Sequence, residues 1–234
     1  WTLYQCMRHE NPAPYGALLE FPFGQVLSSS PEQFLSLHEG LAKTRPIKGT
    51  RPRGNTADQD RALRAQLLSS EKDRAENVMI VDLLRNDLGK VCEPGTIEVP
   101  DLFQVESFAT VHHLVSTVTG RLRTDRDALD LIAACFPGGS ITGAPKRRAM
   151  EIIDELEPVR REVYCGNVIR LGFDGNLDSS ITIRTALKQG NSVYYWAGGG
   201  IVADSDCDAE YQESLDKAAA FLRLVGQPPV GGSC

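Results

Sequence analysis

The chain has 234 residues, of which 41% are hydrophobic, and this is enough for one large core or two small ones. Its 31 acidic and 25 basic residues give a formal net charge of −6, so a nucleic acid would be repelled rather than attracted. The sequence has no run of about 18 apolar residues, so it predicts neither a membrane-spanning helix nor a membrane partner.

Six cysteines are scattered along the chain without any Cys-x-x-Cys pair. In a chain of this length, that pattern is typical of reduced, mostly buried thiols, so it predicts a cytoplasmic location and no thiolate metal site. The sequence opens on Trp1 rather than on methionine and shows no secretory leader. We therefore expect it to begin inside a longer protein.

Short strands are predicted first along the chain, at residues 17–21 and 25–29, where apolar residues are bounded by Gly and Pro. The Arg, Pro, Gly, Asn and Asp of residues 50–60 predict an exposed loop. A helix is expected next, because Ser70-x-x-Asp73 resembles a capping box and Gly89 provides a stop.

The later elements are expected in this order: strand and loop at 95–108, a β-branched strand at 111–120, helices at 127–135 and 145–156, strands at 180–185 and 192–196 joined by a turn, and a last helix at about 208–225. Strands with intervening helices and hairpin turns predict an α+β fold with largely antiparallel sheets. We expect residues 1–225 to form one domain and residues 226–234 to form a loose tail.

Two of the predicted helices carry pairs of carboxylates. Asp73 and Glu76 are three residues apart on one helix, and Glu210 and Glu213 on another, with Lys217 one turn further along. Two such pairs could hold Mg²⁺, which prefers oxygen ligands and keeps several waters. Spacing alone favours the alternative, in which each pair belongs to a solvated helix face.

Two glycine-rich segments suggest close approach of a ligand to the backbone. Residues 137–146, Pro-Gly-Gly-Ser-Ile-Thr-Gly-Ala-Pro-Lys, are expected to lead straight into a helix N-terminus, where exposed N–H groups favour an anion. Gly198, Gly199 and Gly200 end an apolar strand, where a ligand or a bulge would explain them. Arg184, expected on an Ile/Thr strand, is either a carboxylate clamp or a surface residue.

Two histidines and one lysine have side chains that could take part in catalysis. His112 and His113 are adjacent in a predicted strand, so they face opposite sides and at most one reaches a common site, a packed histidine being the alternative. Lys48 lies between a proline and a glycine. A lysine is nucleophilic only when neutral, which requires burial or a cationic neighbour, and an exposed loop lysine is the alternative.

Eight segments taken together resemble the chorismate-binding enzymes, a family that includes anthranilate synthase, aminodeoxychorismate synthase, isochorismate synthase and salicylate synthase. They occur in this order: Ser30–Glu32, Pro46–Thr50, Lys72–Asn77, His113–Thr117, Pro137–Lys146, Ile183–Thr185, Ala197–Val202 and Glu210–Glu213. The resemblance covers residues 1–225. It implies the C-terminal portion of the two-layered anthranilate synthase-like fold, with an N-terminal half that would lie upstream of Trp1.

The resemblance also implies roles for the candidate residues. Glu76 and Glu213 are similar to the Mg²⁺ carboxylates of the family, with Asp73 and Glu210 nearby. Glu32 is similar to its general acid/base and His113 to its active-site histidine, both near the 4-hydroxyl of chorismate. The carboxylates of the substrate would be held by Gly139, Ser140, Thr142, Tyr164, Arg184, Gly198, Gly199, Gly200 and Lys217.

Lys48 bears on the branch of the family. The motif Pro-Ile-Lys-Gly-Thr resembles aminodeoxychorismate synthase component I, whereas anthranilate synthases usually carry alanine in place of Lys48. The resemblance implies amination of chorismate to 4-amino-4-deoxychorismate, for 4-aminobenzoate and folate, through a covalent Lys48 intermediate. Because the chain has no Cys/His glutaminase signature, ammonia is expected from a glutamine amidotransferase partner. Anthranilate synthase component I, isochorismate synthase and a non-catalytic binder stay open as alternatives.

Overall fold

The computed structural model describes residues 1–226. Its helices are α1 (Thr2–Glu10), α2 (Ala57–Ser69), α3 (Glu71–Gly89), α4 (Ala128–Cys135), the 3₁₀ helix η1 (Gly139–Ile141), α5 (Lys146–Leu156) and α6 (Cys207–Leu224). Within this described part, no helix is both long and apolar enough to cross a bilayer. Of the expected loose tail, all residues after Gly226 lie outside the described part.

The strands are short except for two long neighbours, β6 and β7. Their bounds are β1 (Tyr15–Phe21), β2 (Gly24–Ser30), β3 (Gln33–His38), β4 (Leu41–Thr44), β5 (Ile47–Pro52), β6 (Glu98–Ser107), β7 (Val111–Arg121), β8 (Asn167–Leu171), β9 (Leu177–Ile181), β10 (Thr185–Gln189) and β11 (Ser192–Tyr195). The strands predicted at residues 17–21, 25–29 and 192–196 are therefore present.

The chain folds into two compact units. One unit, which we call the terminal unit, contains residues 1–32, 159–168 and 180–226 of the described chain. The other, the central unit, contains residues 33–158 and 169–179. Each unit thus collects segments that are far apart in the sequence.

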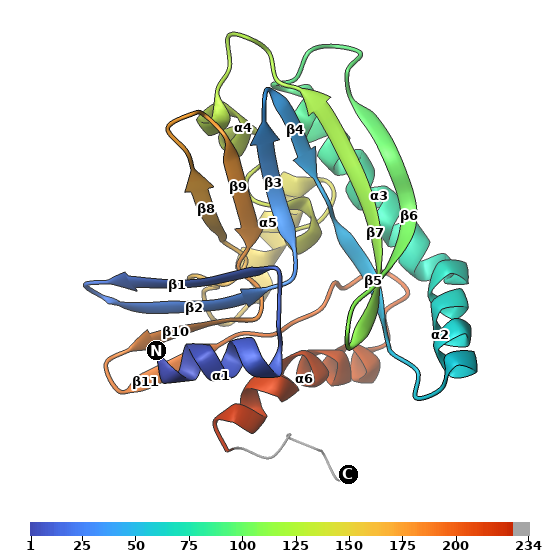
Figure 1. The fold of residues 1–234 in the computed structure, drawn as a ribbon, viewed down its shortest axis with the longest axis vertical. Coiled ribbons are helices and arrows are strands. Elements are labelled where there is room, and N and C mark those ends of the chain that lie inside the picture. Colours follow the sequence, from blue (N-terminus) through green and yellow to red (C-terminus); the bar gives the residue numbers. More distant parts are fainter. Residues whose placement is uncertain (227–234) are drawn as a thin grey trace. The chain divides into compact units, whose positions relative to one another are not determined.

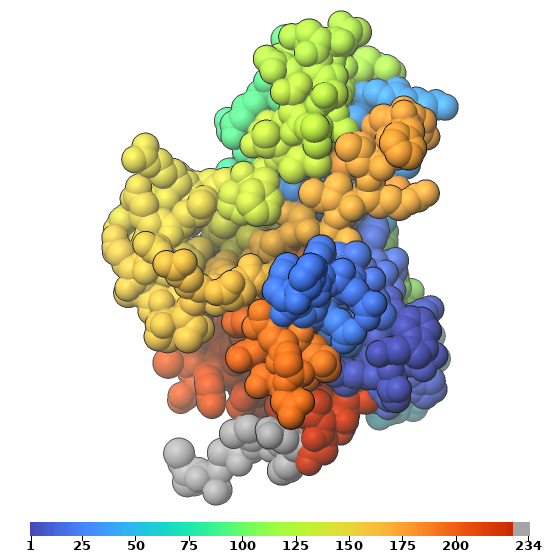
Figure 2. Space-filling model, turned by 90° about the vertical axis from the view of Figure 1, so that its left-hand side faces the viewer, coloured from blue at the N-terminus to red at the C-terminus, as the bar shows by residue number. Residues whose placement is uncertain are grey.

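The terminal unit is built on a four-stranded antiparallel sheet with the order β1-β2-β10-β11. Two hairpins meet at its centre, where Leu27 of β2 lies opposite Ala186 of β10. In Figure 2 the blue surface of the first hairpin lies against the orange surface of the second. The turn predicted after Gln189 is confirmed, and Gly190 adopts the positive φ of 54° that glycine tolerates.

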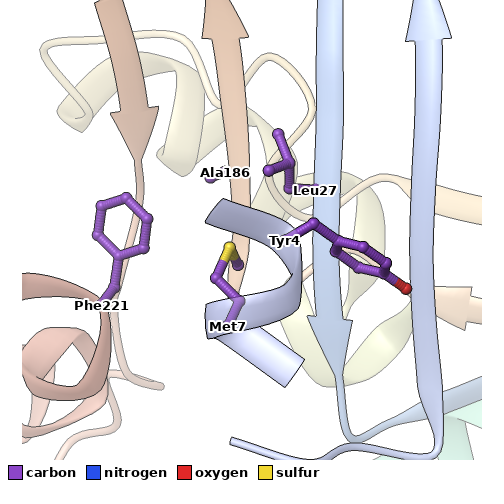
Figure 3. Close-up of a cluster of buried hydrophobic side chains, with 5 residues drawn as sticks. All are labelled: Tyr4, Met7, Leu27, Ala186 and Phe221. Carbon is purple, nitrogen blue, oxygen red and sulfur yellow. The ribbon is translucent and has the colours of Figure 1, made fainter. Parts of the chain in front are cut away.

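Helices α1 and α6 cover this sheet and close its core, as Figure 1 shows. The buried side chains drawn in Figure 3 come from α1, β2, β10 and α6; they are Tyr4, Met7, Leu27, Ala186 and Phe221. The ring of Phe221 stacks on that of Tyr195 with 4.2 Å between centroids. Helix α1 has no side-chain cap and only two buried residues, so neither a capping motif nor an apolar periodicity predicts it.

The central unit is organised around β7, whose residues are almost all buried. Strand β6 pairs with one edge of β7, while β4 and β5 follow each other along its other edge. The seven-stranded sheet has the order β5-β7-β4-β3-β9-β8, with β6 added on β7. Helix α3 packs on β7, and the buried Ser116 hydroxyl donates to Asn77 Oδ1 of α3 at 2.6 Å.

The predicted helix at residues 70–89 is confirmed, and the Ser70 hydroxyl accepts a hydrogen bond from the backbone N–H of Asp73. The prediction of a loop over residues 50–60 is wrong at both ends. Strand β5 extends to Pro52, and α2 begins at Ala57 with Thr56 as its N-cap. Only Leu67 of α2 is buried, so the helix lacks the apolar periodicity by which a sequence announces one.

The single strand predicted over residues 180–185 is also wrong. Strand β9 ends at Ile181 and β10 begins at Thr185, and the two strands belong to different sheets. Arg184 lies in the break between them with a φ of +50°, so it does not project from a regular strand. The alternation of apolar and polar residues continues across the break, which is why the sequence does not reveal it.

We predict that Phe221→Ala lowers the free energy of unfolding by about 3–5 kcal/mol, because a large buried ring leaves a cavity beside Tyr195. Phe173 is fully exposed and provides the control, with an expected change for Phe173→Ala within about 0.5 kcal/mol. Urea denaturation followed by far-UV circular dichroism measures both. Equal losses for the two variants would contradict the packing described here.

Candidate functional site

The structure divides the predicted site residues between the two units. The central unit holds Lys48, Asp73, Glu76, His113, Gly139, Ser140 and Thr142. The terminal unit holds Glu32, Tyr164, Arg184, Gly198, Gly199, Gly200, Glu210, Glu213 and Lys217. We call these sets the lysine cluster and the glutamate cluster.

Lys48 lies at a β-bulge in β5. Ile47 pairs with Val115 and Thr50 with His113, so the β5 segment between these pairs is one residue longer than the facing segment of β7. A bulge of this kind redirects a side chain relative to the regular strand. Gly49 has a φ of +87°, a backbone conformation that residues other than glycine adopt only at an energetic cost.

The amine of Lys48 is held inside the central unit. Its Nζ donates to the carbonyl oxygen of Ser140 at 3.4 Å and lies 3.9 Å from Glu76 Oε2. The Lys48 side chain is 16% exposed and that of Glu76 is 18% exposed. The alternative of an exposed loop lysine is therefore excluded, and three of the predicted residues from β5, α3 and η1 meet at one point.

Asp73 faces β5 one turn before Glu76 on α3. Its Oδ2 accepts a hydrogen bond from Arg51 Nη2 at 3.2 Å. A Cβ atom added to Gly49 would lie 2.8 Å from Asp73 Cγ and 2.9 Å from Leu67 Cδ1. Glycine at this position therefore lets β5 approach the two helices closely enough to bring Lys48 to Glu76.

His113 and His112 are both buried, and they belong to different networks. His113 Nδ1 lies 2.9 Å from the Thr50 hydroxyl, which is its cross-strand partner on β5. His112 bridges Ser107 at 2.7 Å and Asp60 at 3.0 Å. Both histidines pair with β5, and the ring of His113 is hydrogen-bonded to that strand through Thr50.

The network of His112 was not foreseen from the sequence, because Asp60 lies in a segment predicted to be an exposed loop. A hydrogen bond from Arg53, together with the Gly54 N–H and His112, holds the pKa of the Asp60 carboxyl well below its usual range. The segment that follows β5 is fixed by this network.

The segment between α4 and α5, residues 136–145, we call the glycine loop. Its Ile141 and Thr142 N–H groups donate to the carbonyls of Gly138 and Gly139, and α5 begins at Lys146. The prediction that these residues lead into a helix N-terminus is confirmed, because α5 follows directly with Pro145 as its N-cap. The sequence did not reveal the 3₁₀ turn within the loop, which presents the carbonyl of Ser140 to Lys48.

Gly139 sits where the glycine loop touches α3. A Cβ atom there would lie 2.6 Å from Leu83 Cδ2, so any larger residue would push the loop away from the helix. The Thr142 hydroxyl donates to the Gly138 carbonyl at 2.9 Å, which fixes the turn from within.

In the glutamate cluster, the carboxylates of α6 lie against a glycine. A Cβ atom on Gly199 would lie 3.0 Å from Glu210 Oε2 and 3.5 Å from Glu213 Oε1. Glu210 is buried, and its Oε1 accepts a hydrogen bond from the Ser205 hydroxyl at 2.6 Å. Glu213 Oε1 pairs with Lys217 Nζ at 2.6 Å.

Lys217 joins the same cluster to Gly198. Its Nζ donates to the Gly198 carbonyl at 3.0 Å, and a Cβ atom on Gly198 would lie 3.2 Å from the hydroxyl of Tyr164. Gly200 follows in the same irregular segment beyond β11 and is exposed. Residues predicted from three separate segments are thus brought together in the terminal unit.

Arg184 lies apart from these contacts and lines a small, partly open cavity of about 20 Å³ in the terminal unit. The cavity is lined by Met7, Glu10, Asn11, Ser29, Arg184, Tyr195, Ala220, Phe221 and Leu224. Burial lowers the pKa of Arg184, although Tyr195 and Glu32 favour its charged form. Burial also raises the pKa of Tyr195 to about 12. A buried guanidinium beside a cavity suits an anionic group such as a carboxylate.

Glu32 is buried at the end of the Ser30-Pro31-Glu32 segment. Its backbone N–H donates to the Ser30 hydroxyl at 3.3 Å, and its carbonyl accepts from the N–H of Ile181 at 3.2 Å. These bonds fix the backbone on both sides of the predicted acid/base residue.

The carboxylates of Glu210 and Glu213 are the kind of oxygen ligand that a hard divalent cation prefers. Over residues 1–226, no group of three His, Cys, Asp or Glu side chains is placed to hold a metal ion. Glu210 Oε2 and Glu213 Oε1 lie 3.0 Å and 3.5 Å from the position of a Cβ atom on Gly199, so the two carboxylates face the same glycine. Such an oxygen donor pair fits Mg²⁺ rather than a softer metal.

Comparison with known proteins relates the whole described chain to one family. The family model described as chorismate binding enzyme matches residues 1–223. Aminodeoxychorismate synthase component 1 of Klebsiella aerogenes is 56% identical over 225 residues, which cover 96% of this chain and 50% of that protein. Anthranilate synthase component 1 of Mycobacterium bovis is 50% identical over 229 residues, which cover 95% of this chain and 44% of the relative.

The fold of the chain is also similar to that of solved structures. The structure of the menaquinone-specific isochorismate synthase of Escherichia coli matches with a TM-score of 0.85 at 27% identity, covering 96% of this chain and 51% of that one. The chain belongs to the chorismate binding enzyme family, and its α+β, largely antiparallel fold is confirmed as that of the family. It spans about half the length of the curated relatives it matches.

We predict that Gly49→Ala displaces the segment of Lys48, because a Cβ there meets Asp73 and Leu67. Gly95→Ala is the matched control, since Gly95 has a similar φ of +82° and nothing within 4 Å of its added Cβ. Both variants bear the cost of a positive φ, and Gly49→Ala should lose about 1–3 kcal/mol more in the free energy of unfolding. Chemical denaturation measures the difference, and equal losses would refute the close contact.

Proposed function

We propose that the chain is the catalytic part of an aminodeoxychorismate synthase component 1. In this proposal it converts chorismate and ammonia to 4-amino-4-deoxychorismate, which serves 4-aminobenzoate and folate biosynthesis. The observation that carries the proposal is the Lys48 amine, largely shielded from solvent and held between the Ser140 carbonyl and the Glu76 carboxylate. The relative from Klebsiella aerogenes supports it, because it bears that name.

Lys48 is the nucleophile in this proposal. Its amine, once neutral, attacks C2 of chorismate while the bond between C4 and the hydroxyl oxygen breaks, and the departing hydroxyl takes a proton from Glu32 and leaves as water. The Lys48 nitrogen, now bonded to C2, gives one proton back to Glu32. His113 acts near the same hydroxyl. Ammonia then forms a bond to C4, the bond between C2 and Lys48 breaks, and the nitrogen on C4 gives its extra proton to the leaving amine.

The remaining cationic and polar groups orient the substrate. Arg184, Tyr164 and Lys217 bind the carboxylates of chorismate, with the backbone of Gly198–Gly200 and of Gly139–Thr142. The buried guanidinium of Arg184 supports this role, because a charge-assisted hydrogen bond is stronger where water is excluded. Lys217 is already fixed on the Gly198 carbonyl and on Glu213.

Mg²⁺ is the proposed cofactor, with Glu76 and Glu213 as its ligands and Asp73 and Glu210 nearby. When bound, it would neutralise the ring carboxylate of the substrate and fix its position. The oxygen-only donor set supports this choice over zinc or copper. Lys217, which is paired with Glu213, also balances the charge of that carboxylate.

A second subunit is part of the proposal. The relatives are named component 1, which supports a separate partner, and we propose a glutamine amidotransferase that supplies ammonia. Location in the cytoplasm is proposed as well. The five cysteines of the described chain are all free, and Cys92, Cys135 and Cys165 among them are buried, in line with a reducing compartment.

Anthranilate synthase component 1 is the second candidate function, because relatives with that name reach 50% identity. The lysine at position 48 favours amination at C4, since anthranilate synthases usually have alanine there. Isochorismate synthase is a weaker candidate, because the structural relatives with that name are 27–28% identical to this chain. A pure binding protein would need neither Lys48 nor the acid Glu32.

The proposal predicts that the enzyme, given chorismate, Mg²⁺ and ammonium, forms 4-amino-4-deoxychorismate. Without ammonium, intact-mass analysis should show a chorismate-derived adduct, which Lys48→Ala abolishes. Lys188→Ala is the control, because Lys188 is an exposed lysine on a strand and should leave the adduct intact. Release of fluorescent anthranilate, or of isochorismate, would refute the assignment.

The metal assignment predicts that Glu76→Gln and Glu213→Gln each weaken Mg²⁺ binding by about tenfold or more, since each removes a negative oxygen donor. Glu98→Gln, at an exposed position of β6, should leave it unchanged. Titration calorimetry with Mg²⁺, or Mn²⁺ electron paramagnetic resonance, measures binding independently of activity. Unaltered affinity in both cluster variants would disprove the assignment.

A further inference from the structure

The C-terminal part of α3 carries a buried ion cluster that the proposed function does not use. Asp87 is 1% exposed, and its two oxygens bind different lysines. Lys146 Nζ lies 2.6 Å from Oδ2, and Lys90 Nζ lies 2.8 Å from Oδ1. A carboxylate so far from solvent is costly to bury unless such partners are in place.

Each lysine of this cluster also reaches the end of α4. Lys146 Nζ donates to the carbonyl of Cys135 at 2.8 Å, and Lys90 Nζ donates to that of Ala134 at 3.3 Å. The last carbonyls of a helix lack partners within it, so cations are favourable there. Cys135 is the last residue of α4 and Lys146 the first of α5. One ammonium group therefore ties together the two ends of the glycine loop.

Helix α3 contributes three residues along its length to the surroundings of Lys48 and the glycine loop. Glu76, Leu83 and Asp87 are spaced by seven and four residues, so they lie along one face of α3. Glu76 lies near Lys48, Leu83 packs under Gly139, and Asp87 holds Lys146. The position of the Ser140 carbonyl relative to Lys48 is thus set by one rigid element.

We propose that Asp87 and Lys146 are positioning residues for Lys48. Their ion pair holds the glycine loop on α3, so the Ser140 carbonyl stays within reach of the Lys48 amine. That hydrogen bond is 3.4 Å long, close to the limit of an effective contact, so a small shift of the loop would break it. The consequence for catalysis rests on the proposed function, whereas the effect on the loop does not.

Charge distinguishes the possible variants of the pair. Asp87→Asn leaves two ammonium groups facing each other across a buried amide, whereas Lys146→Met leaves Asp87 paired with Lys90. The double variant removes the buried carboxylate together with its buried cation, and Lys90, whose side chain is 52% exposed, can turn to solvent. The double variant should therefore regain most of the thermal stability that Asp87→Asn loses.

The test compares the complete protein with Asp87→Asn, Lys146→Met, the double variant and the conservative Lys146→Arg. Asp82→Asn is the control, because Asp82 lies on the same helix in an exposed pair with Arg85. Three quantities are measured: the melting temperature, hydrogen exchange of the glycine loop, and the rate at which chorismate modifies Lys48 without ammonium.

We expect the melting temperature of the double variant to return close to that of the unaltered protein. The glycine loop of the double variant should remain less protected from hydrogen exchange. Exchange at the N–H groups of Ile141 and Thr142 should be faster than in the unaltered protein. Modification of Lys48 by chorismate should be slower by about tenfold or more. Lys146→Arg should retain more of the loop protection and of the modification rate than Lys146→Met does. Asp82→Asn should change none of the three.

Loop protection in the double variant equal to that of the unaltered protein would overturn the positioning role, and the pair would then serve stability alone. Protection lost while the rate of Lys48 modification is unaltered would overturn it as well. If the unaltered protein forms no adduct at Lys48, the proposed function fails, and the exchange data still decide whether Asp87 and Lys146 hold the loop.

Discussion

The placement of one ammonium group, that of Lys48, is the constraint on which the central unit depends. Strand β5 must leave the regular register of β7, because otherwise the side chain of Lys48 would follow the alternation of the strand. The bulge costs a positive φ at Gly49. It brings the amine to a carbonyl of the glycine loop and to a carboxylate of α3, two groups that favour a lysine at the same point.

Glycines make the other close approaches of both clusters possible, and each does so by lacking a Cβ atom. Gly139 lets the glycine loop rest on Leu83, and Gly199 lets the chain after β11 lie against the carboxylates of α6. In the first case the space is filled by a side chain. In the second it borders charged oxygens, which is the arrangement expected where a cation and a substrate oxygen are to be bound.

Several charged side chains in and around the candidate site are buried. Asp87, Glu32 and Glu210 are all at most 9% exposed, and Arg184 lines a small cavity. Buried charges weaken a fold unless they are paired, so their presence indicates geometry that is kept for a purpose other than stability. The family relationship supplies that purpose, the handling of a dicarboxylate, as a proposal for this chain.

The sequence by itself determined the elements whose signals are local: the helices that begin at Ser70 and Asp127 and the hairpin around Gly190. It also determined the family, because the eight motifs and their order can be read from the sequence without a structure. Helix α2, with one buried residue, and the break before β10 were decided only by tertiary structure. So was the meeting of Lys48 with Ser140, since a contact across more than ninety residues depends on strand register and on the packing of α3, which no local pattern encodes.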